Sequence, residues 1–286
     1  MTSFGGSFGT ERGLVFRPPS TANLMIDSAD RPNPTTTSPM DIQISKSQAL
    51  LNGFFTRIAT TEVVLEWCVN NIQGGTIGVD ISGVAHTINV ADGIYTVENL
   101  LNQIIHEMDL LAIAGYNFQI TDGEGTGGKV YIYSGNENLD FEFTSDPDGI
   151  LAKLDIGLNV LANAQLVGCP DLRPYRYIDF VCSQLTYAQD VKDSSSAPSN
   201  RDVLCRWYFA EDTPDALDAY GFPILMGYTR FCRRRLFNPP KYIKWDNNLP
   251  VGNLSFQVYG NDGNIVDVNP GEVNTNWLMT LQISEN

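Results

Sequence analysis

The chain has 286 residues, with 18 Lys and Arg against 33 Asp and Glu, and so a formal net charge of −15 at neutral pH. Its length supports one large domain or two small ones, and a hydrophobic content of 43% excludes a chain that stays unfolded. The acidity disfavours binding to nucleic acid or to an anionic membrane, because both carry charge of the same sign. No apolar run is long enough to span a membrane, and the first residues do not resemble a secretory signal.

Residues 1–23 are rich in Gly, Ser, Thr and Pro, and we expect them to form a flexible arm. From Met40 onward, apolar and polar residues alternate with the period of a half-buried antiparallel strand. Eight such stretches lie around 40–44, 62–67, 178–182, 203–209, 224–230, 242–245, 254–259 and 277–283. This pattern predicts a mainly β fold, a single eight-stranded jelly-roll sandwich built from residues 24–72 and 171–286.

Residues 73–170 have a different pattern. A hairpin is predicted over 76–90, and Thr96 is placed to cap a helix whose apolar residues between Val97 and Leu111 share one face. Strands at 118–121, 129–133 and 140–143 and a short helix at 149–156 follow. We interpret residues 73–170 as a small α+β module inserted into a loop of the sandwich. The alternative is that its strands belong to the main sheets.

The sequence offers no catalytic constellation. Glycine-rich residues 123–128 are followed by a strand, whereas a phosphate-binding loop needs a helix there. His86 and His106 have no credible nucleophile near them, and no pair of carboxylates stands out for glycoside hydrolysis. The five cysteines contain no Cys-x-x-Cys pair, which disfavours a zinc site and favours buried, reduced thiols. We therefore predict a protein that is not an enzyme, with no catalytic residue, cofactor site or metal ligand.

One stretch of fifteen residues carries six basic side chains and no acidic one. The six are Arg230, Arg233, Arg234, Arg235, Lys241 and Lys244. The stretch is interpreted either as a solvated basic loop or as a docking surface for an acidic partner, such as a second copy of the chain. On the second interpretation these residues are candidates for a subunit interface.

A polar elbow precedes the first predicted strand. Asp27 and Asp30 stand beside Arg31, just ahead of proline-rich residues 32–39. These three side chains are candidates for anchoring the arm by charge-assisted hydrogen bonds. The alternative is a simple turn in which an aspartate side chain accepts a hydrogen bond from the backbone.

Three stretches, taken in order, carry a resemblance to one family. They are Ile26–Arg31 (IDSADR), residues 87–96 (TINVADGIYT) with the helix that follows, and Pro239–Trp245 (PPKYIKW) with residues 252–263. They resemble segments of the penton, or minor capsid, proteins of double-stranded DNA viruses of the double-jelly-roll lineage, which includes virophages, Polinton-like viruses and giant-virus relatives. The resemblance spans residues 26–283.

The resemblance implies a single jelly roll that forms homopentamers at the fivefold vertices of a virion, without a catalytic site. It also implies an outward insertion, a neighbouring major capsid protein and a vertex spike or host receptor as partners, and synthesis in the host cytoplasm or nucleus. One alternative is another capsid-associated protein, such as a cement protein or a spike base. A second alternative is a receptor- or carbohydrate-binding β-sandwich, such as a fibre head.

Overall fold

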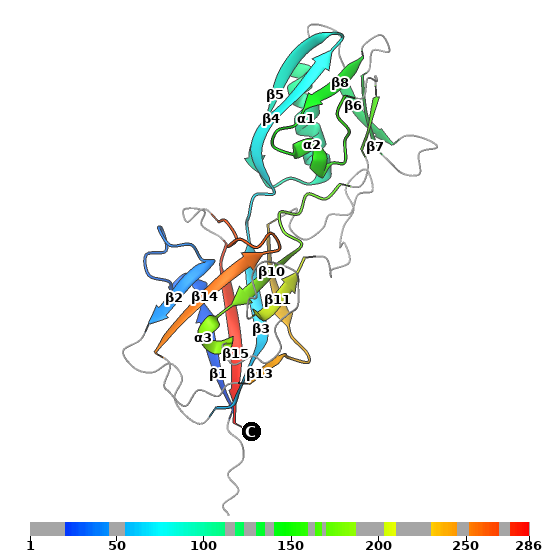
Figure 1. Ribbon diagram of the computed structural model, residues 1–286. Helices are drawn as coiled ribbons and strands as arrows, with labels where there is room; N and C mark the ends of the chain where they lie inside the picture. Colours follow the sequence, from blue (N-terminus) through cyan, green and yellow to red (C-terminus); the bar gives the residue numbers. More distant parts are fainter. Residues whose placement is uncertain are drawn as a thin grey trace, which may run out of the picture.

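The computed structural model describes residues 21–45, 55–111, 118–122, 130–134, 140–159, 164–167, 170–186, 203–209, 230–244, 252–268 and 275–285. These residues form two bodies that follow one another along the length of the molecule (Figure 1). A two-sheet sandwich contains the early and late parts of the chain, and a smaller body of mixed helix and strand contains the middle.

Two antiparallel sheets make up the sandwich. The five-stranded sheet contains, in order, β1 (Thr21–Asp27), β15 (Trp277–Ser284), β3 (Arg57–Trp67) and β12 (Phe231–Leu236), and β13 (Tyr242–Lys244) also pairs with β3. The four-stranded sheet contains, in order, β11 (Val203–Tyr208), β10 (Tyr177–Val181), β14 (Asn253–Gly260) and β2 (Asp41–Ser45). A 3-10 turn, η1 (Ser28–Asp30), follows β1, and a short helix, α3 (Ser183–Thr186), follows β10.

The strands β12 and β13 together form one edge of the five-stranded sheet. Leu236 of β12 lies opposite Glu62 of β3, and Tyr242 of β13 lies opposite Ala59. The edge advances six residues between these pairs while β3 advances three, so the extra residues form a bulge. β12 and β13 are therefore one interrupted strand.

Counted in this way, the described part of the sandwich has eight strands. In chain order they are β1, β2, β3, β10, β11, the pair β12–β13, β14 and β15, and we number them 1 to 8. Their spatial order is then 1-8-3-6 in the five-stranded sheet and 5-4-7-2 in the four-stranded sheet. This order is the jelly-roll topology, in which two Greek keys form the two sheets. The fold class predicted from the sequence, a mainly β jelly roll with an inserted α+β module, is confirmed.

Aromatic side chains fill the space between the two sheets. Trp277 of β15 is fully buried, and its ring centroid lies 5.4 Å from that of Phe180 on β10 and 5.9 Å from that of Phe256 on β14. The indole nitrogen of Trp277 donates a hydrogen bond to the carbonyl oxygen of Pro39 over 2.7 Å. One side chain thus contacts both inner strands of the opposite sheet, and each ring contact adds about 0.5–1.5 kcal/mol beyond its apolar burial.

One of the expected boundaries is corrected by the structure. β1 begins at Thr21, so the last three residues of the expected arm, 1–23, are paired with β15. Thr21, Ala22 and Asn23 are all exposed, and such a segment joins a sheet through backbone hydrogen bonds that leave no apolar alternation in the sequence. Residues 1–20 lie outside the described residues. The strand expected at 224–230 lies outside them except for Arg230, and β12 starts one residue later.

The middle of the chain forms the inserted module. Its larger sheet has the order β5 (Val84–Gly93), β4 (Ile72–Ile81) and β8 (Phe141–Ser145), and its smaller sheet has the order β6 (Phe118–Asp122), β7 (Val130–Ser134) and β9 (Ala164–Val167). Two helices, α1 (Val97–Leu111) and α2 (Ile150–Lys153), complete it. Every described strand of the module pairs with another strand of the module. Within the described residues, therefore, none of its strands joins the sheets of the sandwich.

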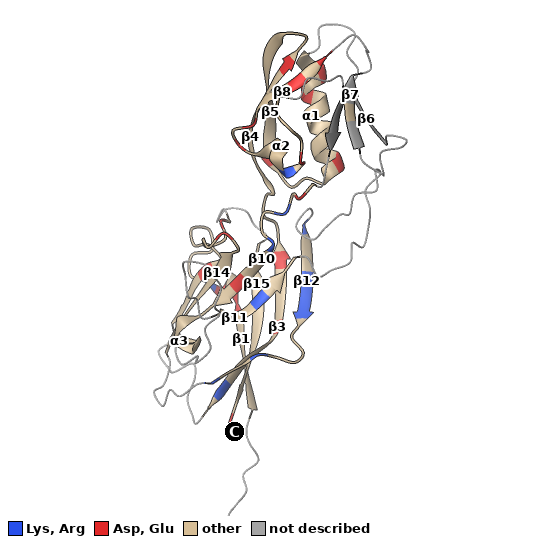
Figure 2. Cartoon of the chain, turned by 45° about the vertical axis from the view of Figure 1, so that its right-hand side comes forward, with Lys and Arg blue, Asp and Glu red and all other residues tan. Residues whose placement is uncertain are grey.

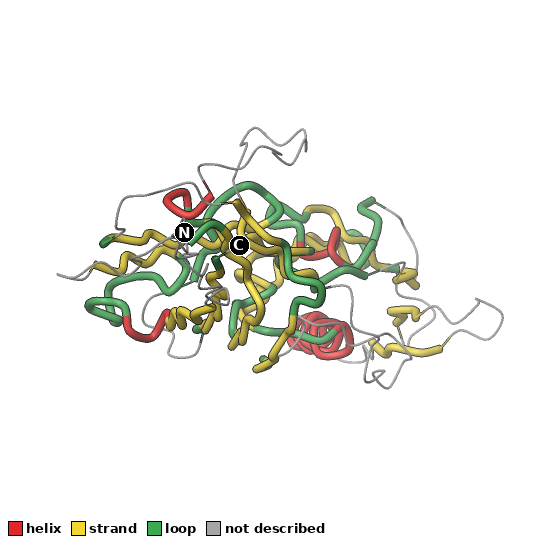
Figure 3. The backbone as a smooth tube through the Cα atoms, turned by 90° about the horizontal axis from the view of Figure 1, so that it is seen from below, coloured by secondary structure: helices red, strands yellow, loops and turns green. Residues whose placement is uncertain are grey.

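Helix α1 begins at the residue that the sequence predicts and has the predicted apolar face. The Oγ1 atom of Thr96 accepts a hydrogen bond from the amide of Asn99 over 3.2 Å, as expected of an N-cap residue. Leu100, Ile104 and Met108 are fully buried in a cluster that shares no residue with the core of the sandwich. The helix stands upright in Figure 1 and is seen end-on in Figure 3, so its axis follows the length of the molecule.

Candidate assembly surfaces

The basic stretch lies on the interrupted edge strand β12–β13 (Figure 2). Phe231 and Phe237 pack against the core of the sandwich and fix the register of this edge. Residues of β12 alternate between half-buried and exposed positions, with Arg233 and Arg235 half-buried and Arg234 exposed. Arg233 to Arg235 thus belong to a strand rather than to the solvated loop that was one of the two interpretations.

The three consecutive arginines of β12 have different surroundings. The guanidinium carbon of Arg235 lies 5.9 Å from the ring centroid of Trp207 on β11 and 5.4 Å from that of Phe237. Arg234 points away from the core and forms an ion pair with Glu62 of β3, with a second hydrogen bond of 3.1 Å. Charged side chains that point inward on an edge strand oppose the addition of another strand. This edge is therefore suited to side-chain contacts rather than to sheet extension.

The other three predicted basic residues lie along the same edge. Arg230 is exposed just before β12, and the ammonium group of Lys241 donates a hydrogen bond to the carbonyl of Val203 on β11 over 3.4 Å. Lys244 on β13 lies directly opposite Arg57 of β3. The structure thus brings all six predicted residues to one flank and adds Arg57. Sequence reasoning missed Arg57, since only the strand register places it there.

The polar elbow holds the connection between β1 and β2. The side chain of Arg31 donates hydrogen bonds to the carbonyl oxygens of Thr37 (2.7 Å), Ser28 (2.8 Å) and Pro34 (3.1 Å) and to the Oδ1 atom of Asn276 (3.0 Å). Asp27 caps η1 by accepting a hydrogen bond from the amide of Ala29 over 2.8 Å, and Asp30 is exposed. Asp27 therefore forms the simple turn, and Arg31 fastens this loop to the segment before β15.

A groove opens between β1 and β2, on the flank opposite the basic edge. It has a volume of about 490 Å³, and its apolar lining includes Leu24, Met25 and Ile44. Met25 is 65% exposed. The carboxylates of Asp27 and Asp30 stand at the same groove, so this flank is acidic where the other is basic.

An aromatic cluster lies on the outer face of the four-stranded sheet. Arg206 of β11 forms a two-point ion pair with Asp179 of β10, at 2.6 and 2.9 Å. Its guanidinium carbon lies 4.0 Å from the ring centroid of Tyr177 and 5.8 Å from that of Tyr208. The hydrogen bonds with Asp179 raise the pKa of Arg206 above its ordinary value. Sequence reasoning missed this cluster, because the register of β10 against β11 assembles it from ordinary strand residues.

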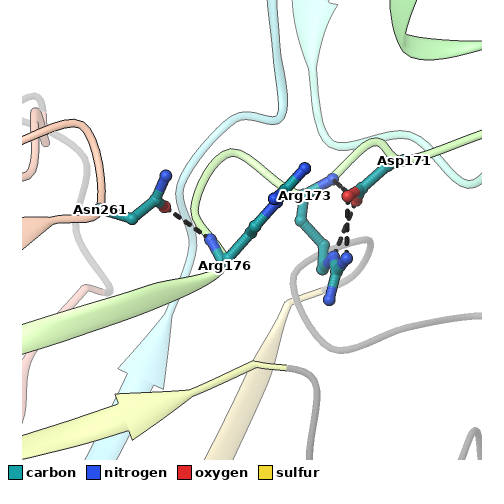
Figure 4. A network of polar contacts seen from close by, with 4 residues as sticks. All are labelled: Asp171, Arg173, Arg176 and Asn261. Carbon is teal, nitrogen blue, oxygen red and sulfur yellow. Dashed lines mark hydrogen bonds and ion pairs between the residues drawn. The ribbon is translucent and has the colours of Figure 1, made fainter.

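A polar cleft of about 510 Å³ lies where the module meets the sandwich, and Lys153 is among the residues that line it. Asp171, Arg176 and Asn261, which Figure 4 shows, line it as well. Asp171 pairs with Arg173 at 2.7 and 2.8 Å, and the amide of Arg176 donates to the Oδ1 atom of Asn261 over 2.7 Å. Burial raises the pKa of the Asp171 carboxyl, but the hydrogen bonds and charge of Arg173 outweigh burial and leave the pKa below its ordinary value.

Among the residues that the structure describes, no three His, Cys, Asp or Glu side chains gather closely enough to hold a metal ion. None of the described helices has the length and apolar character needed to cross a membrane. Cys68, Cys182 and Cys205 are buried as expected, and burial raises the pKa of Cys182 to about 11 and that of Cys205 to about 12. These last two thiols are therefore protonated at neutral pH.

No protein-family model and no curated protein matches the chain. Among solved structures, the chain is similar to the mavirus penton protein, at 12% sequence identity and a TM-score of 0.46, over 94% of this chain and 100% of that one. It is also similar to a chain of the 3.5 Å cryo-EM structure of the Sputnik virophage, at 12% identity and a TM-score of 0.47, over 93% of this chain and 98% of that one. The first of these is a penton protein, the class that the sequence motifs resemble.

Proposed function

We propose that the chain is a structural subunit of a viral capsid, of the penton type, and that five copies form a ring at a fivefold vertex. The observation that supports this best is the placement of the module. It is inserted between β3 and β10, at one end of the jelly roll, and lies away from both flanks of the sandwich (Figure 1). A jelly roll whose two flanks are not covered by any of the described residues can contact a neighbour on each side, as a ring requires.

The distribution of charge supports a cyclic arrangement. The flank of β12 and β13 is basic, and the flank of β1 and β2 carries Asp27, Asp30 and Asp41. Contacts between two different surfaces of identical subunits are heterologous, and such contacts close into rings when the rotation between neighbours allows it. Opposite charge on the two surfaces favours this mode over contact between like flanks.

In the proposed role, the jelly roll and the module contact different partners. The jelly roll makes the contacts with further copies and with the neighbouring major capsid protein. The module, which stands at the end of the sandwich, is available to a vertex spike or a host receptor. No catalytic step is part of this role, and the location is the virion.

The experiment is a direct determination of the assembly state. Purified full-length protein is examined by native mass spectrometry across a concentration series and by negative-stain electron microscopy. Rings with the mass of five chains support the proposal. Trimers contradict it and favour a fibre head, whereas a monomer at every concentration contradicts a ring of any kind.

A second candidate function is carbohydrate binding. Tyr177, Tyr208, Arg206 and Asp179 form an aromatic and charged patch on the outer face of the four-stranded sheet, and Tyr208 is 38% exposed. Aromatic rings beside a planar ion pair are a suitable surface for a sugar ring. A glycan array separates this candidate function from the first. Carbohydrate binding requires saturable binding of a glycan that is lost in Tyr208→Ala, whereas a purely structural subunit shows none.

A further inference from the structure

The two flanks match each other in more than charge. On the basic edge, Leu236 is 62% exposed and stands two residues from Arg234, whose side chain is 63% exposed; both face away from the core. On the opposite flank, the apolar lining of the β1–β2 groove includes Leu24, Met25 and Ile44, with two carboxylates beside them. Each flank thus combines exposed apolar surface with charge of one sign.

The positions of these features fit a head-to-tail contact. β1 and β12 are the opposite edges of the five-stranded sheet, and β2 and β11 are the opposite edges of the four-stranded sheet. Arg235 on β12 lies over Trp207 on β11, which shows that these two edges share one flank, and the groove shows that β1 and β2 share the other. A copy that offers its basic edge to a neighbour therefore keeps its own groove available to the next copy.

We infer that the β1–β2 groove of one copy receives the β12 edge of the next copy. Leu236 packs on Met25 and Ile44, and Arg234 faces Asp27 and Asp30. This inference rests on the proposed ring and names the surfaces that form it. Sheet extension across the contact is disfavoured by the inward-pointing Arg233 and Arg235, so the side chains of β12 make the contact. An exposed arginine beside an apolar residue is typical of the residues that dominate the binding energy of interfaces.

The test uses the full-length chain and native mass spectrometry over a concentration series. Leu236→Asp is expected to raise the concentration needed for assembly by at least about tenfold, because it places a carboxylate on the apolar floor of an acidic groove. Leu110→Asp is the matched control, since Leu110 is 67% exposed on α1 of the module. Equal melting temperatures of the two variants establish that Leu236→Asp is folded.

A charge exchange identifies the partners. Arg234→Glu and Asp30→Lys, made singly, each weaken assembly, and the double variant regains it because the two charges have been exchanged. Asp109→Lys, an exposed carboxylate of α1, is the control for Asp30→Lys.

The outcomes separate the two proposals. If the wild type forms pentamers that no groove or edge variant weakens, the contact is overturned and the ring stands. If the wild type forms another oligomer that Leu236→Asp disrupts and the exchange restores, the contact stands and the pentamer is overturned. A wild type that stays monomeric at every concentration overturns both.

Discussion

Lys153 of α2 donates a hydrogen bond from its ammonium group to the backbone carbonyl of Asn71 over 2.6 Å. Asn71 lies where the chain leaves the sandwich for the module. The carbonyl of Lys153 in turn accepts a hydrogen bond from the amide of Asp171 over 2.8 Å, where the chain returns. One residue of the module therefore holds the outgoing and the returning segments side by side.

Replacing Lys153 by Met keeps most of the aliphatic stem and removes the donor to Asn71. We expect a loss of about 1.5–3 kcal/mol in the stability of the module, the usual order for a hydrogen bond to a charged group. Hydrogen exchange resolved by segment should become faster at residues 70–74, while the sandwich keeps its protection. Lys244→Met, at an exposed position on β13, is the control for the loss of a charge. Unchanged exchange at 70–74 would contradict the role given to Lys153.

The adjacency of the two segments allows the module to be removed. We expect replacement of residues 75–168 by a short Gly/Ser linker to leave a folded jelly roll, because no described residue of that range belongs to the core cluster of the sandwich. Far-ultraviolet circular dichroism and a cooperative thermal transition check this outcome. An insoluble or unfolded product would show that the two bodies form one cooperative domain.

The ion pair of Asp171 with Arg173 predicts a dependence on pH. The pKa of Asp171 is lower in the folded protein than its ordinary value of 3.8, so ionisation stabilises the fold. This contribution is complete above the ordinary pKa and is lost as the pH falls through the lowered one. The stability difference between wild type and Asp171→Asn should therefore be constant near neutral pH and shrink below about pH 4. Urea unfolding at several pH values measures it, with Asp109→Asn on α1 as the control.

Removing the aromatic link between the sheets should have a large effect. We expect Trp277→Ala to destabilise the protein by about 3–5 kcal/mol, because it opens a cavity beside Phe180 and Phe256. The next residue, Leu278, is half-buried on the outer face, and Leu278→Ala should cost less than half as much. The two variants are compared by their midpoints of urea unfolding, provided that the dependence of the free energy of unfolding on urea concentration is the same in both. Equal losses would mean that Trp277 does not link the sheets.

Substitutions of Arg235 and Arg234 test whether the first stabilises the monomer while the second is available for contacts with another copy. We expect Arg235→Gln to lower the stability of the monomer by about 0.5–1 kcal/mol, because the guanidinium group above Trp207 and Phe237 is lost. Arg234→Gln should change the stability of the monomer less, since its pair with Glu62 is solvent-exposed. Thermal melting of both variants in dilute solution distinguishes them. Reversing all three arginines together would mix the two effects, so single variants are the sharper measurement.

The sequence was sufficient for those parts of the fold in which apolar periodicity is strong. Helix α1 begins at the predicted residue and buries the predicted apolar face, because its apolar residues recur at helical spacing after a capping threonine. The sequence was not sufficient to predict β12, because arginine occupies positions on its core side that apolar residues usually fill. For Arg235, the inward position depends on Trp207 of β11, which is distant in sequence. The acidic groove likewise arises from β1 and β2 meeting at one flank, which only the folded chain shows.

The point of attachment between the two bodies determines how the molecule responds to a pulling force. The chain enters the module from β3 and returns from it into β10, and these strands belong to different sheets. β3 has β15 on one side and β12 and β13 on the other, and β10 lies between β11 and β14. A force applied to the module is thus shared between two strands, each hydrogen-bonded along both edges. Extracting either strand requires shearing its two ladders together rather than peeling them one bond at a time, which is the mechanically resistant geometry.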